Sequence, residues 1–180
     1  MAFLNGPGFL RLVLDRYQGS HAYLLYPQDE GARLRSAELL ALGVVDGDRS
    51  AVILSSFSPQ PSDVTGPVIV DLPSGVLAGG ASLKSIRYRQ SSNVHARIRS
   101  DLQADGNLKP EFAGCALCLG APLQMARDAE RARAMLARNW ERYVEAMKDN
   151  LRWDRKDAGI SRAGARLRVT LEPNELVVIE

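Results

Sequence analysis

Basic residues cluster in the middle of this 180-residue chain, where they could neutralise phosphates. The stretch KSIRYRQ begins at Lys84 and is followed by His95, Arg97 and Arg99, with no acidic residue between Lys84 and Arg99. Cationic groups bind phosphates, and a tyrosine ring among them can stack on a base. The sequence therefore predicts a nucleic-acid-binding surface made of Lys84, Arg87, Tyr88, Arg89, Arg97 and Arg99, extended by Arg152, Arg155, Lys156 and Arg162.

A second interpretation of the same stretch is a solvated strand face. Its arginines would then form ion pairs within the chain, with Asp101, Asp105 or the carboxylates of a later helix as partners. The net charge is only +2, from 23 Lys and Arg against 21 Asp and Glu. Any nucleic-acid binding must therefore depend on where the cations lie and not on the total charge. Both interpretations stay open at the level of the sequence.

Cys115 and Cys118 are the two cysteines of the chain and form one C-A-L-C pair. A redox pair needs its first thiol at a helix N-terminus, and Pro122 indicates that the next helix starts beyond the pair. A zinc site needs two further ligands, which His21, His95 or a second chain would have to supply. Reduced thiols flanked by apolar residues are the simplest interpretation. We predict no metal and no cofactor, and Cys115 and Cys118 stay as candidates for a metal.

Catalysis has few candidate residues. His95 lies near Ser91, Ser92 and Asp101 in the sequence, and a metal-independent ribonuclease of the toxin type needs little beyond a basic groove and one acid/base pair. The chain contains no G-x-S-x-G, Walker loop, H-E-x-x-H or dinucleotide fingerprint. A ribonuclease with His95 as its base is therefore a third hypothesis, and no catalytic residue is predicted for the leading one.

The first third of the chain has the pattern of short strands. Residues 9–17 alternate apolar and polar, residues 18–20 form a Gly-containing turn, and residues 22–26 and 51–55 are apolar runs. Leu34 fits a third short strand, residues 36–42 resemble one helical turn, and residues 43–48 contain turn residues. This layout predicts a small N-terminal β-barrel.

The same residues carry a resemblance. The series Asp15-Arg16-Tyr17-Gln18-Gly19, residues 22–25, Leu39-Leu40, Gly43-Val44 and Asp46-Gly47-Asp48 resembles a family of short bacterial domains of unknown function, whose members read roughly D-R-F-E-G, an apolar strand, an L-P-x-G turn and E-G-D. The resemblance covers about residues 9–55. It implies a small barrel fold, and because the family has no agreed activity it implies no catalytic residue.

The remainder of the chain predicts more strands and one long helix. Residues 56–66 contain two prolines and form a loop, residues 68–71 a strand, and residues 81–98 alternate in places. Residues 122–151 lack Gly and Pro after Pro122 and repeat apolar residues every three or four positions, as in an amphipathic helix. Residues 166–171 and 176–179 predict a C-terminal hairpin turned at Pro173-Asn174.

A helix over residues 122–151 would be longer than a small barrel of roughly 25 Å, because each residue adds about 1.5 Å. Part of it would overhang and bind a second copy or another subunit through the stripe Leu136, Trp140, Tyr143 and Met147. A structural or assembly subunit is accordingly the second functional hypothesis.

The predicted fold class is α+β, with an N-terminal barrel module at 1–56 and, at 57–180, a mixed β region, the long helix and the hairpin, packed against the first module or separate from it. The leading function is a non-catalytic module that binds RNA or DNA and oligomerises through its helix. Each apolar run is interrupted well before the roughly 20 residues that cross a bilayer, and no basic segment precedes the first one. We therefore expect no membrane partner and a cytoplasmic location.

Overall fold

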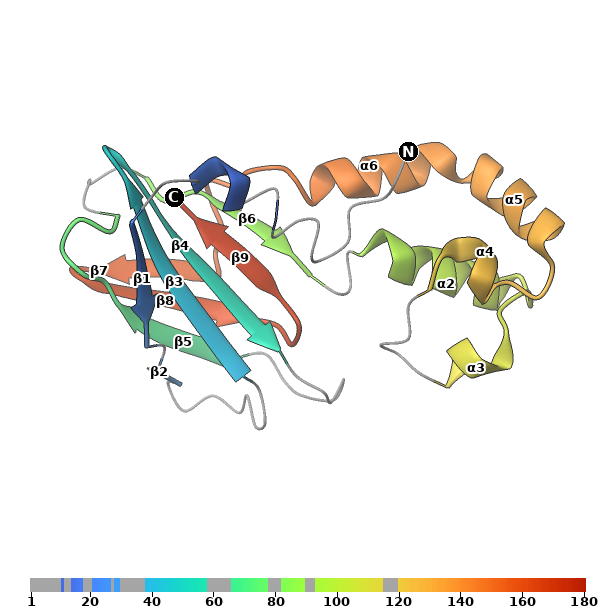
Figure 1. Ribbon diagram of the computed structural model, residues 1–180, viewed down its shortest axis with the longest axis horizontal. Helices are drawn as coiled ribbons and strands as arrows, with labels where there is room; N and C mark the ends of the chain where they lie inside the picture. Colours follow the sequence, from blue (N-terminus) through green and yellow to red (C-terminus); the bar gives the residue numbers. More distant parts are fainter. Residues whose placement is uncertain are drawn as a thin grey trace.

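Two antiparallel β-sheets and five short α-helices make up the computed structural model, which describes residues 11, 14–17, 21–26, 28–29, 38–57, 66–77, 82–89, 93–114 and 120–180 (Figure 1). The five-stranded sheet has the order β1 (His21–Leu25), β3 (Glu38–Asp46), β4 (Arg49–Phe57), β9 (Leu176–Ile179) and β6 (Ser85–Tyr88). The four-stranded sheet has the order β2 (Gln28–Asp29), β5 (Gly66–Asp71), β8 (Arg166–Leu171) and β7 (Ile160–Ala163).

The two sheets pack face to face around one apolar core. Alternate residues of a strand point to the same face, and Val52 and Leu54 of β4 meet Val68 and Val70 of β5 in this core. The side chains that share it are fully or almost fully buried and come from both sheets: Ala41, Val52, Leu54, Val68, Val70, Leu167, Val169, Leu171, Val177 and Ile179. The fold is a β-sandwich with a helical extension.

The predicted N-terminal barrel, which the family resemblance also implies, is wrong. β3 and β4 do not close on themselves, because β4 pairs with β9 from the far end of the chain, with Val52 opposite Ile179 and Leu54 opposite Val177. Among the described strands, the edge strands β1 and β6 do not pair with each other, so the sheet stays open. The sheet therefore combines strands from both expected modules, 1–56 and 57–180.

Local predictions in this region have mixed outcomes. The strands expected at 22–26, 51–55 and 68–71 are confirmed as β1, β4 and β5. Residues 36–42 are not a helical turn, since the described part belongs to β3, and Asp15–Tyr17 is a 3-10 helix, η1, instead of a strand. β1 consequently pairs with β3. Gly47 supplies the φ of 59° for the two-residue turn between β3 and β4. Leu34 lies outside the described residues.

The long helix expected over residues 122–151 is also wrong, because three helices occupy this range. They are α4 (Pro122–Met125), α5 (Ala129–Arg138) and α6 (Trp140–Asp149), and they pack with α2 (Val94–Ala104) around a second core, while α3 (Pro110–Ala113) follows α2. Ile98, Leu102, Met125, Ala132 and Tyr143 are fully buried in this helical core. The apolar repeat is real, but it serves three short helices packed within the chain (Figure 1).

The helix is interrupted at Ala126 because the main chain there pairs with residues 107–109. Ala126 is extended and forms a bridge with Leu108, and the Arg127 N–H donates to the Asn107 carbonyl at 2.8 Å. Asp128 then starts a new helix, with its carboxylate accepting from the N–H groups of Glu130 and Arg131. A single helix through 126–128 would lose all of these hydrogen bonds.

The C-terminal strands lie where they were expected, but the predicted hairpin is wrong. β8 pairs with β5 and β7, whereas β9 lies between β4 and β6 in the other sheet. The connection crosses the sandwich at Glu175, which is 1% exposed and whose main chain bonds to Ser56. Because β8 and β9 supply strands to opposite sheets, the turn at Pro173-Asn174 is a crossover between layers.

The chain after α6 covers part of the outer face of the five-stranded sheet. Leu151 and Trp153 pack on a cluster that includes Ile86, Tyr88 and Val178, and Asp154 forms a bridge with Ser85 at the start of β6. This contact places the basic segment after Trp153 beside β6. No helix in the described ranges is long and apolar enough to cross a membrane.

Candidate nucleic-acid interface

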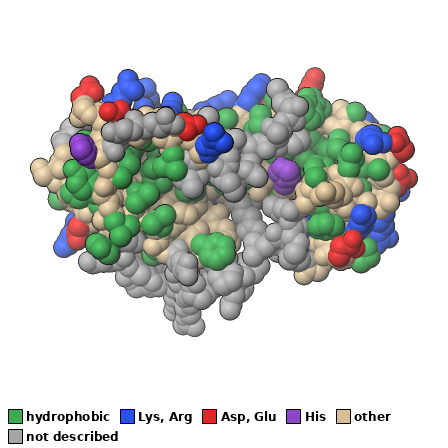
Figure 2. All heavy atoms as spheres, in the orientation of Figure 1, with side chains coloured by type: hydrophobic (Ala, Val, Ile, Leu, Met, Phe, Trp, Pro, Cys, Tyr) green, Lys and Arg blue, Asp and Glu red, His purple; other side chains and the backbone are tan. Residues whose placement is uncertain are grey.

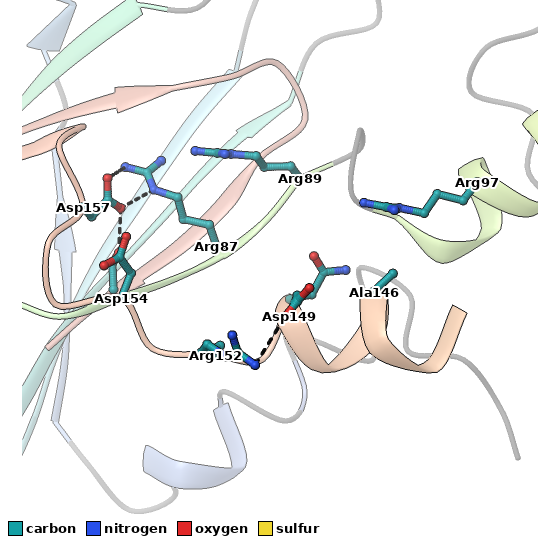
Figure 3. A pocket seen from close by; sticks show the side chains of 10 residues that line it. Arg87, Arg89, Arg97, Ala146, Asp149, Arg152, Asp154 and Asp157 are labelled. Atoms are coloured by element: carbon teal, nitrogen blue, oxygen red, sulfur yellow. Dashed lines mark hydrogen bonds and ion pairs between the residues drawn. The ribbon is translucent and has the colours of Figure 1, made fainter. Parts of the chain in front are cut away.

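Two adjoining pockets gather most of the predicted basic residues beside β6. The first, here called the basic pocket, has a volume of about 380 Å³ and is lined by Ser82, Leu83, Lys84, Ser85, Arg155, Lys156, Asp157, Ile160, Ser161 and Arg162. The second, here called the junction pocket, measures about 280 Å³ and lies between β6, α2 and the end of α6 (Figure 3). Its lining is Ser85, Arg87, Arg89, Arg97, Ala146, Asp149, Asn150, Arg152, Asp154 and Asp157. Ser85 and Asp157 belong to both.

Main-chain pairing holds the two walls of these pockets together. The Ser85 N–H donates to the Asp154 carbonyl and the Asp154 N–H donates to the Ser85 carbonyl, each at 2.7 Å. Lys84 continues β6 outward, where its N–H and carbonyl bond to Glu180. The segment from Arg152 onward is thus attached to the sheet edge, and its Arg155 and Lys156 line one pocket with Lys84.

Arg87 is a structural residue and not a free cation. Its side chain is 10% exposed and donates to Asp157 at 2.5 Å, to Glu175 at 2.8 Å and to the Thr170 carbonyl at 3.0 Å. Burial alone would lower the pKa of Arg87, but its hydrogen bonds and charge attraction to Asp157 and Glu175 outweigh this and raise it. For Asp157, burial would raise the pKa, and the bonds from Arg87 and Ser85 lower it instead.

Arg89 also forms ion pairs within the chain. Its Nε lies 2.9 Å from Glu175 and 3.3 Å from Glu172. The alternative of internal ion pairs is therefore correct for Arg87 and Arg89, although the partners are not those expected. Asp101 instead binds Arg142 and Tyr143, and Asp105 binds Arg131.

Lys84 lies at the rim of the basic pocket and is tied to the C-terminal residue. Its Nζ is 2.7 Å from Glu180 and 4.8 Å from the centre of the Trp153 ring. Tyr17 donates to the same carboxylate. Burial would raise the pKa of Glu180, but the bonds from Lys84 and Tyr17 lower it. Lys84 is still partly exposed, so a phosphate can compete for it.

The remaining cations of the basic pocket have no carboxylate partner in the structure as described. Arg155 and Lys156 are exposed, and no ion pair joins either of them to an acid within the described ranges. Arg162 donates to the Gly164 and Leu77 carbonyls, which orient its guanidinium but do not neutralise it. The one acid of the lining, Asp157, is paired with Arg87. The lining of the basic pocket therefore has three cations, Arg155, Lys156 and Arg162, that no described carboxylate neutralises.

In the junction pocket, Arg97 and Arg152 keep exposed guanidiniums. Arg97 extends from α2 toward the space between β6 and α6 (Figure 3), and no described carboxylate pairs with it. Arg152 has one weak partner, Asp149, at 3.5 Å. Arg97 also lines a third pocket with Asp101 and Arg142.

Three predicted site residues lie elsewhere. Tyr88 is 6% exposed under Leu151 and Trp153, so it cannot stack on a base, and burial raises its pKa to about 12. The strand pattern expected through residue 98 is wrong from Asn93 onward, because Asn93 is the N-cap of α2, which begins at Val94. Arg99 on that helix donates to the Phe112 and Ala113 carbonyls. His95 lines none of the three pockets.

The expected interface stripe packs inside the chain. Tyr143 is fully buried and bonds to Asp101, while Leu136 and Met147 pack against the helical core. Of the four residues, only Trp140 is exposed, at 38%. Cys115 and Cys118 lie outside the described residues, and within those residues no group of three His, Asp, Glu or Cys side chains could hold a metal ion.

Sequence reasoning missed the acids that neutralise Arg87. Asp157 and Glu175 lie 70 and 88 residues further along the chain, and no local spacing relates them to β6.

The comparisons with protein-family models, with curated proteins and with solved structures found no match to this chain.

Proposed function

We propose that the protein is a non-catalytic module that binds nucleic acid, with the basic pocket as its phosphate site. The observation that carries this proposal is the lining of that pocket: Lys84, Arg155, Lys156 and Arg162 surround one acid, Asp157, whose charge is already met by Arg87. Three of these cations, Arg155, Lys156 and Arg162, have no carboxylate partner in the described structure, and Lys84 shares Glu180 while staying partly exposed. Clustered cations of this kind bind phosphates and release counterions when they do so. Such a module belongs in the cytoplasm.

The proposed contacts differ from the basic stretch as it appears in the sequence. Lys84, Arg155, Lys156 and Arg162 contact phosphate, and Arg97 and Arg152 add to the surface from the junction pocket. Arg87 and Arg89 do not contact phosphate in this proposal. They hold Asp157 and Glu175 in place by ion pairs. Phosphate binding by the cations of the basic pocket is electrostatic and independent of sequence.

A structural or assembly subunit is the second candidate, and one observation favours it. Leu24, Leu40 and Phe57 are 57%, 48% and 56% exposed, and their strand positions place them on the outer face of the five-stranded sheet. Figure 2 shows hydrophobic side chains gathered over this sheet. Apolar groups exposed together are typical of a surface that binds another protein.

The test is equilibrium binding of a fluorescent single-stranded oligonucleotide, followed by anisotropy at low salt. The variant Arg155→Glu/Lys156→Glu should bind at least about tenfold more weakly, because two phosphate contacts become repulsive. The matched control is Arg133→Glu/Arg138→Glu, which reverses two exposed arginines on α5 outside the described pockets. Equal binding by both variants and the native protein would refute the proposal.

Tryptophan fluorescence supplies a second readout that reports on the pocket itself. Trp140→Phe leaves Trp153 as the sole tryptophan of the chain, since it has two. Lys84 lies over the Trp153 ring, so a phosphate that draws Lys84 away changes the emission of Trp153. No change of emission on addition of a binding oligonucleotide would exclude Lys84 from the site.

A further inference from the structure

The junction pocket differs chemically from the basic pocket that it adjoins. Its lining holds four arginines and three acids, Asp149, Asp154 and Asp157. Arg87 of β6 and Arg89, which follows the strand, are already neutralised. A phosphate would therefore gain little in this pocket. Polar acceptors and a guanidinium plane are instead the groups that bind a nucleobase.

Asp154 is the acceptor that a base would meet. One oxygen accepts the Lys156 N–H at 2.7 Å, which fixes the carboxylate in place. No ion pair engages Asp154 among the residues that the structure describes. A carboxylate accepts hydrogen bonds from the exocyclic amino group of cytosine, and it repels phosphate.

Arg97 provides the flat cation opposite β6. Its guanidinium reaches from α2 into the junction pocket (Figure 3) and is not paired with a carboxylate in the described chain. Guanidinium planes stack on aromatic rings, including bases. A base that stacks on Arg97 would lie in the pocket that Asp154 also lines.

The size of the junction pocket fits a single base. Its volume is about 280 Å³, which is enough for one base-sized group inside it. In a duplex the amino edges are paired and the bases are stacked, so none can enter a recess of this kind without being flipped out. A single strand has bases that are free to do so.

We infer that the protein binds single-stranded nucleic acid, with a phosphate in the basic pocket and the neighbouring unpaired base in the junction pocket between Arg97 and Asp154. This inference rests on the proposed function, since the basic pocket anchors the strand. RNA and DNA share the chemistry that it uses, so both sugar types serve as probes.

The experiment compares oligo(C), oligo(U), oligo(dC), oligo(dT) and a duplex DNA of equal length in anisotropy titrations with the full chain. Cytosine carries an amino group where uracil and thymine carry a carbonyl, while their size is similar. We expect single strands to bind at least about tenfold more tightly than the duplex. Oligo(C) and oligo(dC) should exceed oligo(U) and oligo(dT) by about two- to tenfold, the effect of one hydrogen bond.

Variants then assign the preference to the junction pocket. Asp154→Asn keeps an oxygen that can accept the Lys156 N–H but removes the carboxylate, so the preference for cytosine should disappear. Arg97→Ala should weaken all single strands, whereas Arg138→Ala, an exposed arginine outside the described pockets, should not.

Equal binding of duplex and single strands, or of cytosine and uracil oligomers, would overturn the inference and leave the proposed function standing. Absence of binding to every probe by a folded protein would instead overturn the proposed function. A cytosine preference that persists in Asp154→Asn would contradict the placement of the base in the junction pocket.

Discussion

Removal of the Arg87 side chain should destabilise the fold strongly, although Arg87 belongs to the basic stretch. In Arg87→Ala, Glu175 would stay at 0% side-chain exposure without its 2.8 Å partner, and Asp157 would lose its 2.5 Å partner. Loss of one member of a buried ion pair typically costs about 3–5 kcal/mol, because the other charge stays buried. Arg89 still lies 2.9 Å from Glu175, so we expect the lower end, about 3 kcal/mol.

Urea unfolding followed by far-UV circular dichroism measures this loss. With a slope of about 2 kcal/mol per molar urea, the midpoint should fall by about 1.5 M. Arg97→Ala is the matched control, because Arg97 is exposed and forms no ion pair in the described structure; its effect should stay within about 0.5 kcal/mol. A loss below about 1 kcal/mol for Arg87→Ala would refute the argument that Arg87 is structural.

Three further predictions concern pH, a helix cap and the exposed sheet face. The folded pKa values of Asp157 and Glu180 are lowered, so their contribution to stability is present above their unfolded pKa values of about 4 and is lost as pH falls through the folded pKa values. Urea midpoints should therefore drop below about pH 4, and less steeply in Asp157→Asn. Asp128→Ala removes the cap of α5 and should lower the free energy of unfolding by about 1 kcal/mol; an unchanged urea midpoint would contradict that role. Leu24→Ser/Phe57→Ser should leave oligonucleotide affinity unchanged, because both residues lie outside the described pockets, and a loss of affinity in anisotropy would connect the apolar face to the site.

The sequence predicts local strands far better than their partners. Short apolar runs identify the strands around Val52 and Val68. Both faces of β4 are covered, since Val52 and Leu54 lie in the sandwich core and Ala51 and Ile53 lie in the cluster on the outer face. It cannot show that Val52 lies opposite Ile179, since that pairing spans most of the chain. The barrel and the hairpin are both errors of pairing, and each assumed that neighbours in sequence pair in space.

The long helix failed for a different reason. Its apolar period was read correctly, but Asn107 and Leu108 bind the main chain of residues 126–128 and interrupt the helix. Asp128 was the available signal, because aspartate ahead of Ala129-Glu130 is a good N-cap.

The candidate site was predictable as a set of charges but not as a geometry. Lys84, Arg155, Lys156 and Arg162 were named from charge alone, and the structure brings them to one pocket. Tyr88 was assigned to the binding face, whereas the apolar residues after α6 cover it. Which cations are free and which are paired depends on acids distant in sequence, so it could not be predicted.

The most direct test of the proposed function is the salt dependence of single-strand binding. For single strands, the slope of log K against log salt is about −0.7 per phosphate neutralised. Contact with the four cations of the basic pocket therefore predicts a slope of about −3 for the native protein, and about −1.5 for Arg155→Glu/Lys156→Glu. The Arg133→Glu/Arg138→Glu control should keep the native slope. A slope near zero, or one that is equal in the native protein and the pocket variant, would contradict a phosphate site in the basic pocket.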